Sequence, residues 1–486
     1  MIPRSWRRLV VGGAALLLTG CDASGSLLAP IDGPATGDAE RPLVDGAPIL
    51  TDADGSLYYG QRLIVLVDAG VDADSLRRLA AVGGDIPLDA IPAINVHYLE
   101  TVGDATQAVE RWRKLPGVRA AALDYIPEHD PAPTAGAPAA VTVAQAADAI
   151  QWGFDAIHAD SAWRYSRGKS ALVGVGDGQW YLPYTAPAGG LPRNYDLNHP
   201  DLDGAVDWVR TSHTNSTLAE YYTKACKAVC AYHGPHVAGI IAAQENGVGI
   251  VGVAPEARLK VFIIGGSYDI LRGAFYLVSS GVDVVNLSMG YKTRFDNKPV
   301  DNALYYYLWR ALAAYAQLSD VLIVTSAGNN NRDASLDPMK RALAAAANGL
   351  VVGNSTRANA RSSSSNYGAA LHLYAPGTDI YSAVSCTGGG AGCWTTLSGT
   401  SMAAPHVAGV AALIYAAARD VDEEPTAEAV AKAILEGAEE GGVSIAGRYL
   451  LNAPAALRAY FKEPCDRSGA SLSTRSADVC TSNAER

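Results

Sequence analysis

The chain lacks an excess of positive charge. Its 486 residues carry 38 Lys and Arg against 49 Asp and Glu, a formal net charge of −11. Proteins that bind nucleic acid neutralise phosphates with clusters of Lys and Arg, so this balance argues against a nucleic-acid partner. An acidic surface favours solubility and says little about a substrate.

The N-terminal region also lacks an apolar run long enough to cross a membrane. Its run covers positions 9–18, whereas a transmembrane helix needs about 20 apolar residues. Arginines precede the run and small residues follow it, which is the arrangement of a secretory signal. The run ends in Leu18-Thr19-Gly20-Cys21, which resembles a bacterial lipobox. We therefore expect positions 1–21 to be a lipoprotein signal, Cys21 to be lipidated, and the protein to be exported to the cell envelope and held at a membrane by its lipid. An ordinary signal peptide with a chance cysteine is the alternative.

Cysteine is scarce, with seven residues in the chain. Apart from Cys21 the cysteines fall into three close pairs, and an even number in an oxidising compartment indicates disulfides. Disulfides that close loops this short contribute about 2–3 kcal/mol each. Proximity alone suggests the pairs Cys226/Cys230, Cys386/Cys393 and Cys465/Cys480. A metal site made of Cys226, Cys230 and the nearby His233 is the weaker alternative.

Two stretches rich in small residues and proline divide the chain. We read 22–60 as a flexible linker and 130–150 as a second linker. Between them, 61–129 alternates strand and helix patterns in the order βαββαβ, the ferredoxin-like arrangement. The predicted strands are 62–68, 86–88, 94–102 and 118–126, and the predicted helices are 72–82, with Asp72 as its cap, and 104–115.

A long alternation of strands and helices occupies positions 151–460. It predicts an α/β fold, a doubly wound and mostly parallel sheet with helices on both faces. Ligands bind such sheets at the carboxyl ends of the strands. The strands are expected at 172–177, 259–265, 282–288, 321–327 and 350–353, and the helices at 234–244, 269–280, 302–317 and 400–417. Positions 461–486 remain as a tail that a disulfide is expected to close.

Ser401 begins the last of these helices. A serine there faces solvent near unpaired N–H groups and the positive end of the helix dipole. It lies in Gly399-Thr400-Ser401-Met402-Ala403-Ala404-Pro405-His406-Val407-Ala408-Gly409. This segment resembles the nucleophile motif of the subtilisin-like serine peptidases along its whole length. The resemblance implies that Ser401 attacks peptide bonds and forms an acyl-enzyme.

A serine hydroxyl is a poor nucleophile until a base takes its proton. The segment His233-Gly234-Pro235-His236-Val237-Ala238-Gly239 resembles the histidine motif of the same family and implies that His233 is that base. The family usually has Thr at the position of Pro235, but proline is tolerated in the first turn of a helix. His236 and His406 lie deeper in their helices and are expected to be packed structural residues.

The base needs an acceptor that orients it. Asp177 ends the strand 172–177, where the family carries its aspartate, and the order Asp, His, Ser is that of subtilisin. Here Gly178 and Gln179 follow the aspartate, whereas the family has Ser or Thr and then Gly, and 180–197 looks like an insertion. Asp196 and Asp201 therefore compete for the role. Asp177 is preferred because a strand end fixes a side chain better than a loop does.

The remaining parts of the active site follow from the resemblance. Asn329, after an apolar strand, is implied to donate its amide to the oxyanion together with the Ser401 N–H. A turn asparagine without that role is the alternative. The segments implied to bind the peptide as an added strand and to form the pocket walls are Ser288, Met289 and Gly290 on one side and Ser326, Ala327 and Gly328 on the other. Small walls indicate an open pocket without a strict charge preference.

The segment 244–250 resembles the family's calcium loop. Oxygen ligands of mixed type suit Ca²⁺. The implied ligands are the carboxylate of Asp201, the side chain of Asn246 and the carbonyls of Gln244, Val248 and Ile250. A loop without metal is the alternative.

The resemblance extends more weakly to 61–129, which matches the family's inhibitory propeptide. We therefore expect a serine endopeptidase that acts on proteins or peptides, is inhibited by its own propeptide and processes itself. Cleavage between the lipid anchor and the catalytic residues would cut the tie to the membrane, so the mature enzyme is either released or retained through the propeptide. The alternatives are a catalytically silent binding lipoprotein and a relative that transfers the acyl group in peptide cyclisation.

Overall fold

The structure is a computed structural model. It describes residues 49–125, 127–128, 151–178, 180, 199–202, 204–211, 232–264, 267–291, 295, 298–384 and 393–462. The predicted signal with Cys21, the residue Asp196 and five of the six paired cysteines (Cys226, Cys230, Cys386, Cys465 and Cys480) lie outside these residues.

The N-terminal region folds as the predicted βαββαβ unit. Its central strand β2 pairs antiparallel with both β4 and β5, and β3 pairs with β4. Both helices begin at an aspartate whose side chain accepts backbone N–H groups, Asp72 for α2 and Asp104 for α3, so the predicted cap is confirmed. The elements are β1 (Ile49–Thr51), β2 (Leu57–Val67), α2 (Ala73–Gly83), β3 (Ile86–Ile91), η2 (Pro92–Ile94), β4 (Val96–Glu100), α3 (Ala105–Trp112) and β5 (Val118–Tyr125).

A seven-stranded sheet organises the rest of the chain. Its order is β14-β13-β12-β10-β7-β9-β8, and every neighbouring pair is parallel. The strands are β7 (Leu172–Asp177), β8 (Val206–Thr211), β9 (Arg258–Ile263), β10 (Val284–Leu287), β12 (Leu322–Ser326), β13 (Gly349–Ser355) and β14 (Leu373–Pro376). Three short antiparallel pairs join β6 (Pro127–Glu128) to β11 (Gly290–Tyr291), β15 (Ile380–Ala383) to β16 (Trp394–Leu397), and β17 (Ser444–Ile445) to β18 (Arg448–Tyr449).

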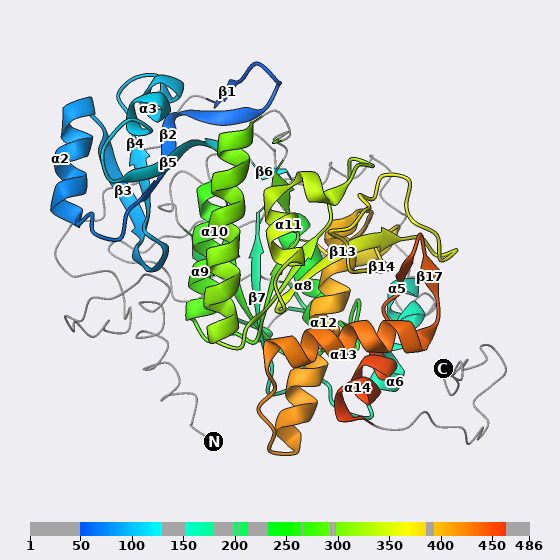
Figure 1. Ribbon diagram of the computed structural model, residues 1–486. Helices are drawn as coiled ribbons and strands as arrows, with labels where there is room; N and C mark the ends of the chain where they lie inside the picture. The colour runs from blue at the N-terminus through cyan, green and yellow to red at the C-terminus, as the bar shows by residue number, and fades with distance from the viewer. Residues whose placement is uncertain are drawn as a thin grey trace, which may run out of the picture.

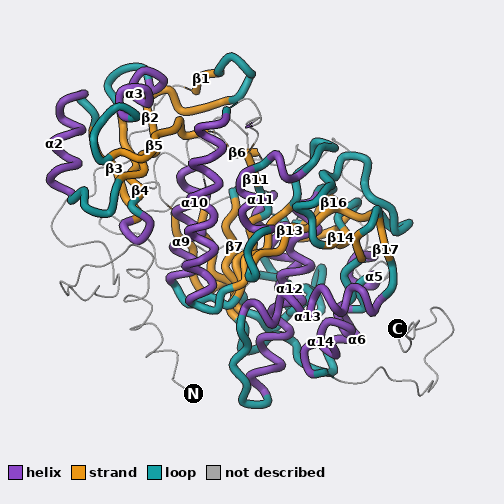
Figure 2. Tube along the Cα trace, in the orientation of Figure 1, coloured by secondary structure: helices purple, strands orange, loops and turns teal. Residues whose placement is uncertain are grey.

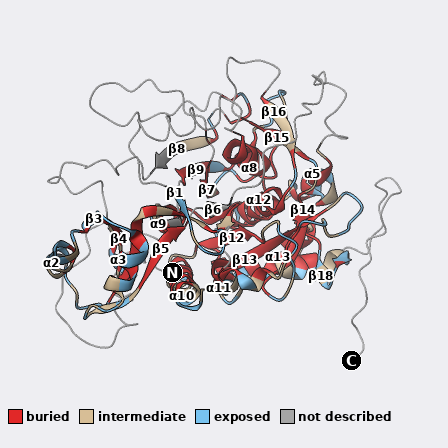
Figure 3. Cartoon of the chain, turned by 90° about the horizontal axis from the view of Figure 1, so that it is seen from above, coloured by how far each residue is buried: buried red, intermediate tan, exposed pale blue. Residues whose placement is uncertain are grey.

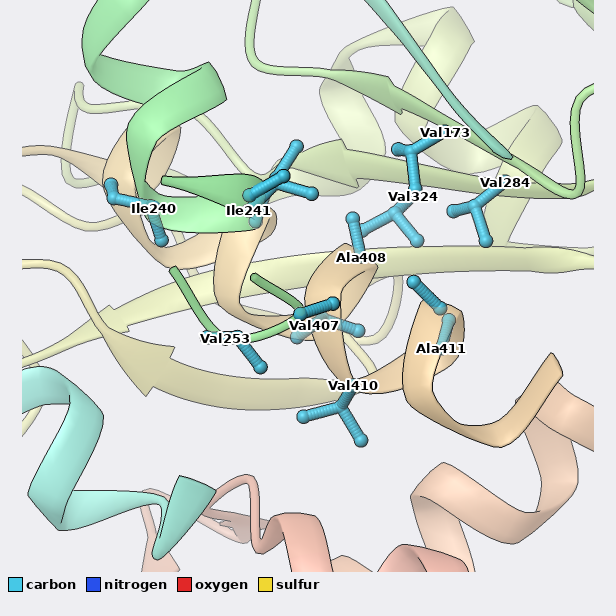
Figure 4. Packing of buried hydrophobic residues seen from close by; sticks show 14 of the residues in the cluster. Val173, Ile240, Ile241, Val253, Val284, Val324, Val407, Ala408, Val410 and Ala411 are labelled. Atoms are coloured by element: carbon cyan, nitrogen blue, oxygen red, sulfur yellow. The ribbon is translucent and has the colours of Figure 1, made fainter. Parts of the chain in front are cut away.

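Helices cover both faces of this sheet (Figures 1 and 2). Successive strand residues point to opposite faces, so Val284 joins the core under α12 while Val285 joins the core under α9 and α10. Figure 4 shows the first core, where Val173, Val284 and Val324 face Val407, Ala408 and Ala411 of α12. The helices are α5 (Trp152–Ala156), α6 (Ala159–Ala162), α8 (His233–Ala242), α9 (Ser267–Ser279), α10 (Pro299–Leu318), η4 (Ala334–Leu336), α11 (Pro338–Ala344), α12 (Thr400–Asp420), α13 (Ala427–Gly441) and α14 (Ala453–Phe461).

The central helix α12 is buried along its length. Figure 3 shows it enclosed by other elements, and its residues from Thr400 to Ala418 are buried. Among the residues that the structure describes, it is the one helix whose length and composition would allow it to cross a membrane. Its burial identifies it as a core helix.

The N-terminal region packs on α9 and α10 (Figure 1), and residues of both sides share one hydrophobic cluster. Polar contacts cross this interface. The Asp124 carboxylate accepts the Tyr268 N–H of α9 at 2.9 Å, and within the N-terminal region it accepts the Tyr98 hydroxyl at 2.6 Å. The Asp301 carboxylate of α10 accepts the Tyr125 hydroxyl at 2.8 Å. Ion pairs join Arg113 to Asp301, Arg272 to Asp89 and Lys298 to Asp52.

Some predicted boundaries are wrong. The linker predicted at 22–60 is wrong from position 49, because β1 and the start of β2 lie in it. The strand predicted at 94–102 begins at Val96, because a 3₁₀ turn precedes it. Strands β8 and β14 and helices α11, α13 and α14 were not predicted.

Candidate active site

Asp177 and His233 form a fully buried pair. Asp177 is the last residue of β7, and His233 is the first residue of α8. The His233 Nδ1 lies 2.7 Å from the Asp177 Oδ1. A carboxylate is an acceptor, so it selects the tautomer with the proton on Nδ1 and leaves Nε2 as the basic nitrogen.

A close approach of Trp180 fixes the start of α8. A Cβ on Gly234 would lie 2.2 Å from the Trp180 indole nitrogen, so only glycine fits beside His233. Trp180 is itself buried. The sequence placed it in an insertion without a role, yet it packs against the helix turn that carries His233.

Ser401 lies in the first turn of α12 and contacts the same edge of the sheet. Its hydroxyl donates to the Ser288 carbonyl at 2.9 Å, and the Ser288 hydroxyl donates to the Ser401 carbonyl at 2.8 Å. Ser288 follows β10, whose last residue pairs with Gly176 of β7. The nucleophile candidate and the Asp177–His233 pair therefore lie where β7 and β10 end.

Asn329 is oriented by the residue before Ser401. Its side-chain oxygen accepts the Thr400 N–H at 2.9 Å and the Thr400 hydroxyl at 3.1 Å. A backbone N–H can only donate, so the atom facing it is the oxygen and the amide nitrogen lies at the other end. The Gly328 N–H in turn donates to the Thr400 hydroxyl at 3.0 Å. Thr400 lies in the quoted motif, but the sequence did not reveal that it holds Asn329.

The other two motif histidines are buried against carbonyls. The His236 Nε2 lies 3.0 Å from the Ile380 carbonyl, and the His406 Nδ1 lies 2.8 Å from the Met402 carbonyl. Burial, with a smaller effect of His233, lowers the pKa of His236 to about 3, and burial lowers the pKa of His406 to about 4. Both side chains are therefore neutral at pH 7 and hold backbone in place.

The two implied pocket walls follow neighbouring strands. Ser288, Met289 and Gly290 come directly after β10, and Ser326, Ala327 and Gly328 come at the end of β12, which pairs with β10. On the first wall, β11 pairs antiparallel with β6 of the N-terminal region, with Gly290 opposite Glu128 and Tyr291 opposite Pro127. This edge thus holds an extended segment of the chain itself, as in β-strand addition.

Asp201 does not contact His233. It is fully buried, and its Oδ2 accepts the Ile250 N–H at 3.0 Å and the Trp394 indole N–H at 2.6 Å. Burial raises the pKa of Asp201 to about 6. Its Oδ1 has no hydrogen-bond partner among the described residues. Asp177 is thus the aspartate that orients His233.

The predicted calcium loop is hydrogen-bonded to the segment that carries Asp201. The Gln244 N–H donates to the Asp201 carbonyl at 2.8 Å, and the Asn246 amide donates to the Pro200 carbonyl at 2.8 Å. The Asn246 side-chain oxygen accepts the Val248 N–H at 2.9 Å. A buried carboxylate oxygen without a partner fits a cation, since burying an uncompensated charge is costly. Within the described residues, no cluster of three His, Cys, Asp or Glu side chains is placed to hold a metal. The predicted calcium ligands are not such a cluster, because backbone carbonyls supply most of them.

Cys393 forms a disulfide. Its predicted partner, Cys386, lies outside the described residues, as do Cys226 and Cys230 of the alternative metal site.

Comparisons with known proteins agree with this architecture. The family model described as the subtilase family, Peptidase_S8, matches residues 193–450. The chain is 32% identical over 285 residues to a thermophilic serine proteinase of Bacillus sp. (strain AK1), covering 56% of this chain and 58% of that protein. It is 32% identical over 283 residues to an intracellular serine protease of Paenibacillus polymyxa, covering 56% of this chain and 74% of that protein.

The fold is similar to that of fervidolysin from Fervidobacterium pennivorans, described as a keratinolytic enzyme related to subtilisin. The TM-score is 0.60 at 21% identity, covering 86% of this chain and 64% of that one. The chain spans less than two thirds of the length of fervidolysin and of the Bacillus proteinase.

The structure combines a parallel α/β sheet with an Asp–His pair and a serine at the start of a helix, all at one edge of the sheet. This combination defines a class: α/β proteins whose site resembles that of a serine peptidase. Because the family model covers more than half of the sequence, this chain belongs to the subtilase family, the subtilisin-like serine peptidases. The predicted family and the predicted α/β fold class are confirmed.

Proposed function

We propose that this chain is a serine endopeptidase that hydrolyses peptide bonds through an acyl-enzyme. One observation carries the proposal: the Asp177–His233 pair lies at the end of β7, and the Ser401 hydroxyl donates to the Ser288 carbonyl at the end of the neighbouring strand β10. In this proposal His233 Nε2 takes the Ser401 proton, and Asp177 stabilises the imidazolium that results.

The remaining groups act on the charge that develops. The Asn329 amide and the Ser401 N–H donate to the oxyanion of the tetrahedral intermediate. His233 then returns the proton to the leaving amine, and water releases the acyl group by the reverse steps. Ser288 to Gly290 and Ser326 to Gly328 line the peptide.

Labelling with a fluorophosphonate tests the chemistry. The wild type is expected to be labelled, and Ser401→Ala and His233→Ala are expected to remain unlabelled. Ser364→Ala, which changes an exposed serine, is the matched control. Labelling that persists in Ser401→Ala at the wild-type rate would overturn the assignment. Product analysis with a peptide and an added amine distinguishes hydrolysis from acyl transfer.

We infer that the N-terminal region acts as an inhibitory propeptide. The support is the pairing of β6 with β11, which occupies the edge that a peptide would use. Self-cleavage within 130–150 would then separate this region from the peptidase. Mass spectrometry of the mature N-terminus is expected to find it in that segment in the wild type, and only the uncut chain in Ser401→Ala.

We infer that Asp201, Gln244, Asn246, Val248 and Ile250 hold Ca²⁺, which would neutralise the buried Asp201 carboxylate. The partnerless Asp201 Oδ1 is the supporting observation. Chelation is expected to lower the melting temperature of the wild type and to have little effect on Asp201→Asn. Equal melting curves with and without chelator in the wild type would contradict the site.

We also propose that the protein is exported and anchored through Cys21, and that processing frees the peptidase from the anchor unless the cut propeptide retains it. Cell fractionation is expected to find the uncut Ser401→Ala protein in the membrane fraction and Cys21→Ala in the soluble fraction. Full-length anchored protein that never matures in active cells would contradict the release.

A further inference from the structure

Lys340 is a buried lysine beside the proposed peptide-binding segment Ser288–Gly290. It lies in α11 and is 1% exposed. Its ammonium donates to the Met289 carbonyl at 2.6 Å and to the Thr325 hydroxyl at 2.7 Å. Burying an ammonium is unfavourable unless polar groups receive its hydrogen bonds, so the surrounding groups and Lys340 are fixed relative to one another.

The bond network reaches a second carbonyl of the same strand. The Thr325 hydroxyl, which accepts from Lys340, donates to the Leu287 carbonyl at 3.0 Å. Leu287 and Met289 are two residues apart, and carbonyls two residues apart along an extended chain point to the same side. One hydroxyl and one ammonium therefore hold both carbonyls on the side that faces β12 and α11.

The intervening residue faces the other way. The Ser288 carbonyl accepts the Ser401 hydroxyl at 2.9 Å. Beyond Met289, Gly290 pairs with Glu128 of β6. A Cβ on Gly290 would lie only 3.4 Å from the Lys340 ammonium, so the strand lies directly against it. Fixing Leu287 and Met289 thus sets the direction of the groups that meet the nucleophile and the added strand.

We propose that Lys340, acting through Thr325 and the Met289 carbonyl, is a positioning residue that holds the segment Ser288–Gly290 in register for an extended peptide. The proposal rests on the proposed peptidase function for its kinetic consequence. Lys340 does not touch substrate. A charge-assisted bond is roughly twice as strong as a neutral one, which suits a group that must hold a strand edge while peptides bind and leave.

The kinetic test compares a long and a small substrate. Lys340→Met keeps the chain length and removes the donors. For a peptide with four residues before the scissile bond, KM is expected to rise about tenfold or more with kcat nearly kept. The inactivation rate by a small fluorophosphonate, which does not use the strand, is expected to change less than about threefold. Lys432→Met, on the exposed face of α13, is the matched control.

Equal losses for the peptide and the small probe would show a general structural role and overturn the proposal. No change in either would overturn it too. Lys340→Arg, which keeps the charge and its donors, is expected to recover part of the KM loss. If Lys340→Met fails to fold, Thr325→Val takes its place, because it removes the hydroxyl that links Lys340 to the Leu287 carbonyl and keeps the lysine bond to Met289.

The second test does not depend on activity. In full-length Ser401→Ala, Lys340→Met is expected to speed amide hydrogen exchange at Gly290 and Tyr291 about tenfold or more, with exchange in α12 unchanged. Unchanged amide exchange at Gly290 and Tyr291 would contradict the positioning role of Lys340. If the wild type reacts with neither peptide nor fluorophosphonate, the peptidase function fails, and this exchange result still decides whether Lys340 holds the strand.

Discussion

The core under α12 and the interface of the N-terminal region with α9 and α10 differ in the chemistry that holds them. Under α12 the sheet contacts small apolar side chains, and a Cβ on Gly409 would already lie 2.6 Å from the Val253 Cβ. At the interface with the N-terminal region, Asp124 accepts the Tyr268 N–H, and Asp301 contacts the Tyr125 hydroxyl and the Arg113 guanidinium. The core under α12 is packed too tightly to accept larger side chains, whereas the interface with the N-terminal region contains carboxyl groups that titrate.

This difference has a consequence for the two regions. Apolar packing depends little on pH, but a carboxylate buried only in a complex links association to protons. Burial raises the pKa of Asp124 to about 6 and also raises the pKa values of Asp89 and Asp301. The packing of the core under α12 is thus expected to depend little on pH, whereas the strength of the interface with the N-terminal region is expected to depend on it.

The largest expected effect is on the peptidase side. Asp177→Asn keeps the shape of the pair but favours the wrong imidazole tautomer, so kcat is expected to fall about 10⁴-fold. Peptide hydrolysis measures it. Asp201→Asn serves as the comparison, because Asp201 contacts Ile250 and Trp394, and it is expected to keep kcat within about tenfold. If kcat fell more in Asp201→Asn than in Asp177→Asn, Asp201 would be the orienting aspartate.

The next effect concerns the oxyanion donor. Asn329→Ala is expected to lower kcat by roughly 10²–10³ with KM little changed, a magnitude carried over from a related protease. Asn330→Ala changes the exposed neighbour and is expected to leave both constants near wild type. A loss confined to KM in Asn329→Ala would contradict a transition-state role.

A smaller effect is expected for the pH dependence of the interface between the N-terminal region and the peptidase region. The pKa of Asp124 in the complex lies above its ordinary value, so association takes up a proton and strengthens as pH falls through 6. Between pH 7 and pH 5 the affinity of the two regions is expected to rise about tenfold, with no further gain below about 4. A protease site engineered within 130–150 separates the regions, and calorimetry measures the affinity.

Asp124→Asn is expected to flatten this pH dependence. Asp74→Asn, which changes an exposed carboxylate of α2, is expected to leave it intact. If the affinity of the wild-type regions rose with pH, this result would contradict a raised pKa of Asp124 in the complex.

The smallest effect removes one neutral donor. Tyr125→Phe deletes the hydroxyl that Asp301 accepts, which is worth about 1 kcal/mol, so affinity is expected to fall about fivefold. The same calorimetry measures it, with Tyr449→Phe on the exposed hairpin as control. An unchanged affinity would show that Arg113 alone satisfies Asp301.

Strong local patterns predicted much of the fold. The strand 172–177 was placed with its observed ends, and the position of Asp177 at its end followed. The starts of α8 and α12 were predicted to within one residue, because each begins at a motif. Strand β14 was missed, since a short buried strand carries no alternation that separates it from a loop.

Long-range contacts explain what the sequence did not reveal. Lys340 in a short helix reads as a surface residue, because lysine is seldom buried. Its ammonium donates to the Met289 carbonyl and the Thr325 hydroxyl, which no local pattern connects to it. Likewise, Trp394 lies far along the chain from Asp201, and only folding brings its indole to that carboxylate.

The two-residue pairing of β6 with β11 has a consequence for competition. While position 128 remains joined to position 151, the segment facing Gly290 is present at a local concentration on the order of millimolar, whatever the concentration of the protein. An incoming peptide must compete with the tethered β6 segment, which cannot diffuse away. Dilution therefore does not open this edge while the chain is intact, and it can do so only after the chain is cut between these positions.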